Sequence, residues 1–390
     1  MSRLRTLSTR RLFILIAVFA VIAAGGAAFA VAAGGGGSTP QPKPLDQAIH
    51  DALTAPQPEG ITARVKFTNN LFPSGSLLGG QASALMSGAS GRLWLRPDEG
   101  RIELQSDAGD AQIVWTKSEV TVYDASSNTV YRATLPADTS QNNSDSNAPP
   151  SLTQIQDFLS HLAEHADVSG ADPTNVAGQP AYSVRTAPKH DGGLLGSAEL
   201  AWDAAQGVPL RVGIYAQGAS SPVLELAVTD ISYGAVSASD VEVAPPAGAQ
   251  TVDVNIGNAD DHAAAGSQVT GLDAVQSAAG FPVAAPDTLV DLPRRDVRLV
   301  GSSDSKAALV VYGQGLGAIV LLERKADSTN GQSAADMLSS LPTVALDGAT
   351  GHELATQLGT IVEWKRDGVQ YVLGGSLPPG AAEAAARNLG

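Results

Sequence analysis

GRLWLRPDEGRIELQS, residues 91–106, is the stretch that decides the fold. Two short runs of alternating apolar and polar residues flank the turn-forming residues Pro97-Asp98-Glu99-Gly100. Alternation with a period of two is typical of a strand with one buried face, and proline, aspartate and glycine favour tight turns. The stretch therefore predicts an antiparallel hairpin of two short strands.

The same pattern continues in both directions along the chain. On the N-terminal side, Ile61, Ala63, Val65 and Phe67 alternate with polar residues and predict a half-buried strand. Amphipathic helices are predicted over 45–53, before this strand, and over 152–165, after a polar loop at 137–150. Further strands are predicted over 111–116, 119–124, 129–134, 171–176, 179–186, 197–203, 209–216 and 223–233. The chain thus predicts a meander of short antiparallel strands interrupted by one helix.

Five segments in this order resemble motifs of one family. They are Gly91–Pro97 with Arg101–Glu103, Val120–Asp124 with Thr129–Arg132, Val176–Tyr182, Leu200–Arg211 and Pro245–Ala249. Together they resemble the lipoprotein-carrier superfamily, which includes LolA-like carriers and the RseB/MucB-like regulators of envelope stress. The resemblance covers residues 45–255, about half of the chain.

This resemblance implies an α+β fold, in which an open antiparallel half-barrel sheet is crossed by helices. In some members of the superfamily the space between sheet and helices takes acyl chains. In the stress regulators the half-barrel is joined to a second small domain, and the protein restrains an anti-sigma factor.

The C-terminal part predicts a small α+β domain over residues 270–390, after a linker at 256–269. Its predicted elements are a helix over 272–279, strands over 297–299, 307–312 and 318–323, a hairpin over 361–373 and a closing helix over 378–389. The glycines of 313–317 are interpreted as a hairpin turn, because a strand rather than a helix follows them.

The N-terminal 36 residues predict a membrane segment, followed by a flexible linker at 37–44. Arg3, Arg5, Arg10 and Arg11 precede an uncharged run at 12–33, and a bilayer-spanning helix needs about 20 residues. Flanking arginines keep their side of the segment in the cytoplasm. The run therefore predicts a single-pass anchor in a bacterial cell membrane, with everything that follows outside. The alternative is a cleaved signal peptide, which would leave the protein secreted.

Composition excludes several classes of function. The chain has no cysteine, which excludes disulfides, thiolate metal sites and a lipid-modified N-terminal cysteine. The formal net charge is −15, and nucleic acid is not an expected partner because phosphate binding needs a basic surface. No cofactor motif is present, and no cofactor is expected.

We expect the ligand site to be an apolar hollow, because an apolar ligand needs a dry concavity lined by aliphatic and aromatic side chains. The residues predicted to line it from the strands are Phe67, Leu93, Leu95, Leu104 and Trp115, with Val65, Ile102 and Ile113 in the same alternating pattern. The residues predicted to form a lid in a stretch rich in glycine and serine are Leu71, Phe72, Leu77, Leu78, Leu85 and Met86. The alternatives are that the strand residues fill a solid core and that the stretch packs as an ordinary loop.

His161-Leu162-Ala163-Glu164-His165 matches a metal-binding pattern on a helix. We do not expect a metal site or an enzyme, because such a site needs a third ligand and a water-polarising pocket. The leading hypothesis is a membrane-tethered extracytoplasmic binder of lipid or lipoprotein acyl chains. The alternative is an RseB/MucB-like regulator that contacts an anti-sigma factor, and a metallohydrolase is a distant third.

Overall fold

A computed structural model describes most of the chain downstream of the predicted anchor. The described ranges are 38–71, 88–135, 150–164, 166–189, 193–254, 269–301, 306–314, 317–326 and 341–389. No helix within these ranges is long and apolar enough to cross a membrane. The predicted anchor at 12–33 lies outside them, as do nearly all of the polar loop at 137–150 and of the linker at 256–269, so these stay predictions.

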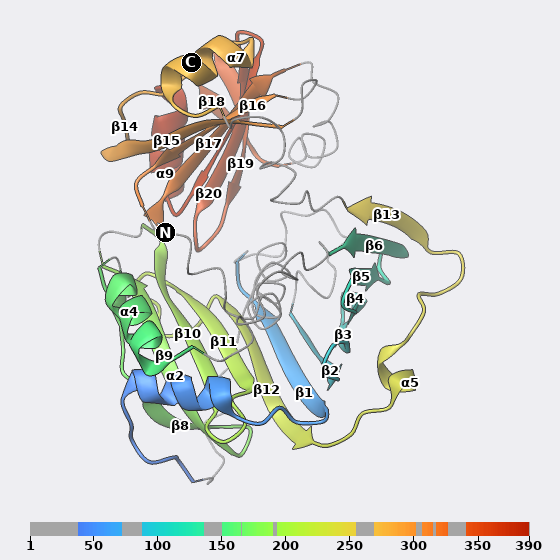
Figure 1. Cartoon of the computed structure of the whole chain (residues 1–390). Coiled ribbons are helices and arrows are strands. Elements are labelled where there is room, and N and C mark those ends of the chain that lie inside the picture. Colours follow the sequence, from blue (N-terminus) through green and yellow to red (C-terminus); the bar gives the residue numbers. More distant parts are fainter. Residues whose placement is uncertain are drawn as a thin grey trace.

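The larger sheet is a curled half-barrel, as the resemblance implied (Figure 1). Its strands are β1 (Ile61–Asn69), β2 (Ala89–Leu95), β3 (Gly100–Ser106), β4 (Gly109–Trp115), β5 (Glu119–Asp124), β6 (Thr129–Thr134), β7 (Ala166–Val168), β8 (Asp172–Val176), β9 (Gln179–Pro188), β10 (Leu195–Asp203), β11 (Pro209–Ala216), β12 (Leu224–Tyr233) and β13 (Gln250–Val254). Their order is β13-β6-β5-β4-β3-β2-β1-β12-β11-β10-β9-β7, with β8 paired to β9. All neighbours are antiparallel except β13, which runs parallel to β6.

Two helices lie on one face of this sheet (Figure 1). Helix α2 (Leu45–Thr54) buries Ala48 against Tyr182 and Trp202, whose ring centroids are 6.1 Å apart. Helix α4 (Leu152–Leu162) lies beside α2, and the Gln156 side chain donates a 2.6 Å hydrogen bond to Asp46. Helix α4 ends at Leu162, earlier than predicted, because the next residues form a turn. A one-turn helix, α5 (Ala238–Val241), follows β12.

The C-terminal part forms a second, separate sheet. Its strands are β14 (Thr288–Leu289), β15 (Leu292–Val300), β16 (Ala307–Tyr312), β17 (Ile319–Lys325), β18 (Thr343–Leu346), β19 (Ala349–Ala355), β20 (Thr360–Arg366) and β21 (Val369–Gly375). Their order is β14-β15-β16-β17-β21-β20-β19-β18. Helices α7 (Leu272–Ala279) and α9 (Pro379–Arg387) share one core with the sheet, in which Trp364 stacks on Tyr371 at 5.0 Å. The predicted hairpins β16–β17 and β20–β21 are both present.

The second sheet contacts the half-barrel through the ends of its strands. The Ser376 Oγ atom accepts a 2.7 Å hydrogen bond from the Leu195 backbone, and the Ser376 carbonyl accepts one of 3.1 Å from Leu194. At the β19–β20 turn, the Gln357 backbone donates to the Leu71 carbonyl at 3.3 Å. Leu358 packs against the apolar core of the half-barrel.

Candidate functional site

The candidate site is the face of the half-barrel that carries the helices, called the inner face below. Its pattern begins on β1, where Ile61, Ala63, Val65 and Phe67 are buried and the residues between them are more exposed. Because side chains alternate across a strand, these four residues lie on one face. The same face carries the main apolar core of the half-barrel.

The pairing of residues between strands shows which residues of β2 to β5 lie on the same face as the buried residues of β1. Ala63 pairs with Leu93, Leu93 with Ile102, Ile102 with Ile113 and Ile113 with Val122. Directly opposed residues in an antiparallel pair lie on the same face. The strand residues that the sequence predicted for the site, from Val65 to Trp115, therefore all share the inner face. Their role as a ligand site stays a prediction.

The register also shows that this is the face covered by α2. Phe67 pairs with Leu226, Leu226 with Val212, Val212 with Leu200 and Leu200 with Val184. Val184 and Leu200 pack in the small core beneath α2. The helices therefore cover one end of the inner face, over β9 and β10, and β2–β5 form its other end.

Burial is uneven along the inner face. Phe67 and Leu104 are each 4% exposed and serve as core. Leu93, Leu95 and Trp115 are only half-buried although they pack against the same core. Val120 and Val122 on β5 are likewise half-buried. The β2–β5 end of the inner face is therefore an apolar surface that the described residues leave partly uncovered.

Glycine residues on this face leave room for large neighbours. A Cβ atom at Gly100 would lie 2.2 Å from Cζ2 of Trp115, so the indole ring lies against the β3 backbone. A Cβ atom at Gly91 would lie 1.7 Å from the Glu103 carbonyl oxygen. These close approaches fix the position of Trp115 and the spacing of β2 and β3.

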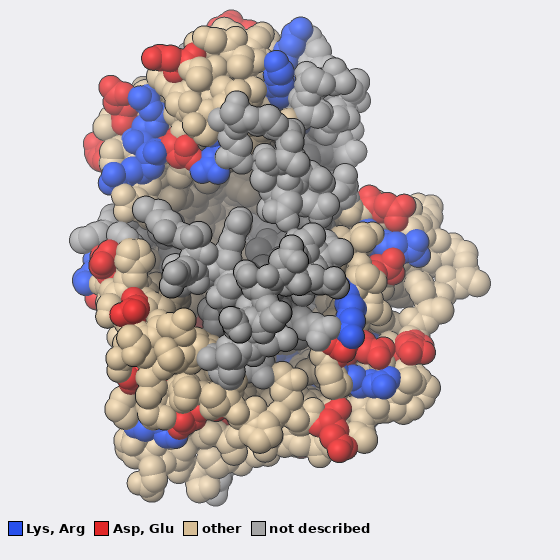
Figure 2. Space-filling view, in the orientation of Figure 1, with Lys and Arg blue, Asp and Glu red and all other residues tan. Residues whose placement is uncertain are grey.

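The outer face of the same strands is polar. Arg92 pairs with Glu103 and Glu103 with Gln112, each directly across from its neighbour. Arg101 lies over the Trp94 ring at 4.9 Å. Where Figure 2 shows described residues, acidic and basic side chains are interspersed rather than gathered in a patch of one sign. The apolar inner face is thus the feature that distinguishes this sheet chemically.

The predicted lid is represented by a single described residue. Leu71 is half-buried and packs against the apolar core of the inner face. Phe72, Leu77, Leu78, Leu85 and Met86 lie outside the described residues, so a lid role for them stays a prediction.

The histidine pattern on α4 forms no metal site among the described residues. Nδ1 of His161 lies 3.5 Å from a Glu164 carboxylate oxygen, and both side chains are largely exposed. His165 lies outside the described residues. No group of three or more potential ligands occurs in the ranges that the structure describes.

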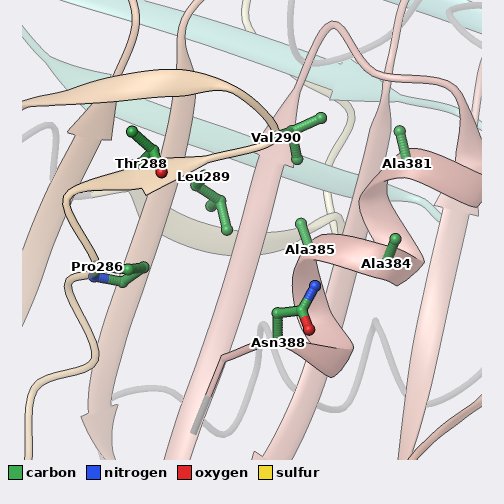
Figure 3. A pocket seen from close by; sticks show the side chains of 8 residues that line it. All are labelled: Pro286, Thr288, Leu289, Val290, Ala381, Ala384, Ala385 and Asn388. Carbon is green, nitrogen blue, oxygen red and sulfur yellow. The ribbon is translucent and has the colours of Figure 1, made fainter.

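A separate pocket of about 410 Å³ lies in the C-terminal domain (Figure 3). Its lining residues are Pro286, Thr288, Leu289, Val290, Ala381, Ala384, Ala385 and Asn388, from the β14–β15 hairpin and α9. The alanine methyl groups of α9 line one side, and Asn388 and Thr288 are the polar members. It is open and contains no titratable group, so the inner face is the stronger candidate site.

Comparison with known proteins gives structural matches only. No family model and no curated protein sequence matches the chain. The fold resembles MucB. A crystal structure of MucB in complex with MucA(peri) is 15% identical, with a TM-score of 0.42, and the match covers 89% of this chain and 96% of that one. The complex of Pseudomonas aeruginosa MucA and MucB matches with 15% identity, a TM-score of 0.43 and coverage of 88% and 96%.

A smaller protein matches only part of the chain. A LolA superfamily protein from Nitrosomonas europaea matches with 8% identity and a TM-score of 0.21, and the match covers 52% of this chain and 98% of that one. At these identities and TM-scores, function has to be argued from this chain's own side chains.

Proposed function

We propose that this protein is a membrane-tethered extracytoplasmic binder of lipid or lipoprotein acyl chains, which it holds on the inner face of the half-barrel. The observation that carries the proposal is the half-buried apolar surface at Leu93, Leu95 and Trp115. Apolar surface that the described residues leave partly uncovered favours an apolar ligand. Each buried acyl methylene contributes about 0.8 kcal/mol, so part of one chain gives useful affinity.

The tether in this proposal rests on the sequence. The uncharged run at 12–33 is long enough to span a bilayer, and arginines precede it. A binder held at the membrane takes its ligand locally instead of diffusing with it. Recovery of the full-length chain in the membrane fraction after a high-salt wash supports the tether, and recovery in the soluble fraction contradicts it.

Native mass spectrometry of the full-length chain tests ligand binding. The expected result is co-purified lipid that is lost in a Leu93→Gln/Leu95→Gln variant, because both substitutions place amides on the inner face. Val114→Gln is the matched control, since Val114 is a half-buried residue on the outer face of β4, which lies two strands away from β2 in the same sheet. Lipid-free wild-type protein, or equal loss of lipid in the control, would argue against an inner-face site.

A regulator that contacts an anti-sigma factor is the second candidate. It is favoured by the second domain, which packs Leu358 against the core of the half-barrel. One matched structure shows MucB in complex with MucA(peri), which gives the kind of partner this alternative predicts. Capture of an anti-sigma factor by the wild-type chain, unchanged in the Leu93→Gln/Leu95→Gln variant, supports this candidate without a role for the inner face.

A further inference from the structure

Strand β13 is the end strand of the half-barrel sheet among the described residues. It pairs with β6 on one side, and no described strand pairs with its other side. All five of its residues are exposed. It contains no proline or lysine, the residues that commonly protect an edge strand from pairing. An exposed edge of this kind is a template for a further strand.

The hydrogen bonds to β6 fix which backbone groups of β13 are free. The Gln250 backbone donates to the Asn128 carbonyl at 3.0 Å, and Gln250 pairs with Thr129. Because successive residues of a strand point their backbone groups in opposite directions, Val252 and Val254 also face β6. Thr251 and Asp253 therefore direct their N–H and C=O groups to the open edge.

The side chains at this edge form an apolar patch. Tyr131, Val252 and Val254 are 41%, 44% and 42% exposed and are among the few large apolar residues that the described chain exposes. Tyr131 pairs with Val252, and Val122 pairs with Tyr131, so the patch lies on the inner face. Only one charged residue, Asp253, occurs in the strand, and its side chain points to the opposite face.

We propose that this edge is an interaction surface for a second copy of the chain, whose β13 pairs antiparallel with the first about a two-fold axis at Val252. In this register Thr251 of each copy lies opposite Asp253 of the other. Both residues have outward N–H and C=O groups, so the two pairs exchange four backbone hydrogen bonds. Val252 lies opposite its own copy, and the apolar patches become continuous on the inner face.

The charge pattern favours this register over its neighbours. A two-fold axis at Asp253 would place two carboxylates directly opposite one another, which is destabilising. An axis at Thr251 would move Asp253 beyond the end of the partner strand and leave its backbone groups unpaired. Only the axis at Val252 lets all the outward backbone N–H and C=O groups of β13, those of Thr251 and Asp253, form hydrogen bonds.

The contact is short, and this determines how it has to be detected. A stable interface buries about 1,200–2,000 Å² in total, and pairing of two five-residue strands falls below this. The net charge of −15 adds long-range repulsion that salt screens. The dimer is therefore transient, and a covalent trap is the appropriate experiment.

Single cysteines provide the trap, because the natural chain has none. In the proposed register Val252 forms a non-hydrogen-bonded pair with a Cα separation of about 4.5 Å, within the range of a disulfide. Two Val254 residues would lie about 13 Å apart, four residues out of register. Val320 on β17, 39% exposed, is the control for an exposed valine elsewhere.

The experiment oxidises full-length chains that carry Val252→Cys, Val254→Cys or Val320→Cys, in mild detergent and at matched concentrations. Val252→Cys is expected to form disulfide dimers at least about tenfold faster than the other two, since only its geometry permits the bond. Adding Thr251→Pro should slow this reaction, because it removes an outward N–H that β6 does not use. Equal rates at all three positions, or faster dimerisation at Val254→Cys, would overturn the proposal.

Discussion

Glu323 places a carboxyl group in the core of the C-terminal domain, where it is fully buried. Its Oε2 atom accepts a 2.8 Å hydrogen bond from the Ala284 backbone, and Oε1 has no partner among the described residues. Burial raises the pKa of Glu323 from its usual 4.5 to about 7, although the Ala284 hydrogen bond opposes the shift. A carboxyl group in this environment makes the stability of the domain depend on pH.

Because the pKa of Glu323 is raised in the folded chain, the free energy of unfolding is expected to fall as the pH rises. Below pH 4.5 the carboxyl is protonated in the folded and the unfolded chain, and burial carries no ionisation penalty. As the pH rises towards 7, the unfolded chain loses the proton and the folded chain keeps it, so the free energy of unfolding falls. Above the raised pKa this loss of unfolding free energy is complete, and it amounts to about 3 kcal/mol.

Glu323→Gln removes this titration. The variant is expected to match the wild type in urea denaturation at about pH 4 and to exceed it at about pH 8, because the amide stays neutral throughout. An identical loss of stability with rising pH in both proteins would show that another group is responsible.

The residues of the candidate site were largely predictable from local alternation. Val65, Phe67, Leu93 and Trp115 alternate with polar neighbours, and the register places them on one face. Which face would be covered was not predictable, because it depends on pairings such as that of Phe67 with Leu226, far apart in the sequence. The half-buried Val120 and Val122 were missed as lining residues, although they alternate within a predicted strand.

At the scale of elements, Ser151 is the N-cap residue that fixes where α4 begins. The Gln154 backbone donates to Ser151 Oγ at 3.3 Å, and the Ser151 backbone donates to the Gln154 side chain at 2.8 Å. This capping box satisfies two N–H groups that the helix itself cannot satisfy. The one buried residue of the helix, Ile155, lies at the end of this first turn, so the cap and the packing of Ile155 hold the turn together.

Ser151→Ala is therefore expected to destabilise α4 by about 1 kcal/mol, with faster amide hydrogen exchange in its first turns. Ser151→Asp should restore protection, because aspartate also caps helices. Ser160→Ala, at an exposed position within the helix, is the matched control and removes no cap. Unchanged exchange in Ser151→Ala would mean that contacts with α2 alone hold the helix.

Two kinds of element were absent from the sequence predictions for different reasons. The β18–β19 hairpin turns at Asp347-Gly348, both with positive φ, and an Asp-Gly pair is a strong hairpin signal that could have been used. Strand β13 gives no such signal, because all its residues are exposed and its partner β6 lies more than a hundred residues earlier. A local sequence pattern cannot predict parallel pairing between strands that lie so far apart in the chain.

At the scale of the whole molecule, the two sheets are joined by a small set of contacts. Leu358, at the β19–β20 turn, packs against the core of the half-barrel. Ser376 accepts a hydrogen bond from Leu195 of the half-barrel and donates one of 3.0 Å to the Leu358 carbonyl. Because Ser376 links Leu358 to the half-barrel, these residues form one unit that positions the second domain.

Leu358→Ala combined with Ser376→Ala is expected to uncouple the domains while each keeps its own core. Small-angle scattering should show a larger radius of gyration, and thermal unfolding should resolve into two transitions, since interfaces within a chain permit domain motion unless they are large and apolar. Ile361→Ala is the matched control, because Ile361 lies three residues away and is 38% exposed. If the double variant scatters like the control and unfolds in the same way, the domains are held by contacts other than Leu358 and Ser376. If instead the domains separate and the variant still carries lipid, the inner face binds without help from the C-terminal domain.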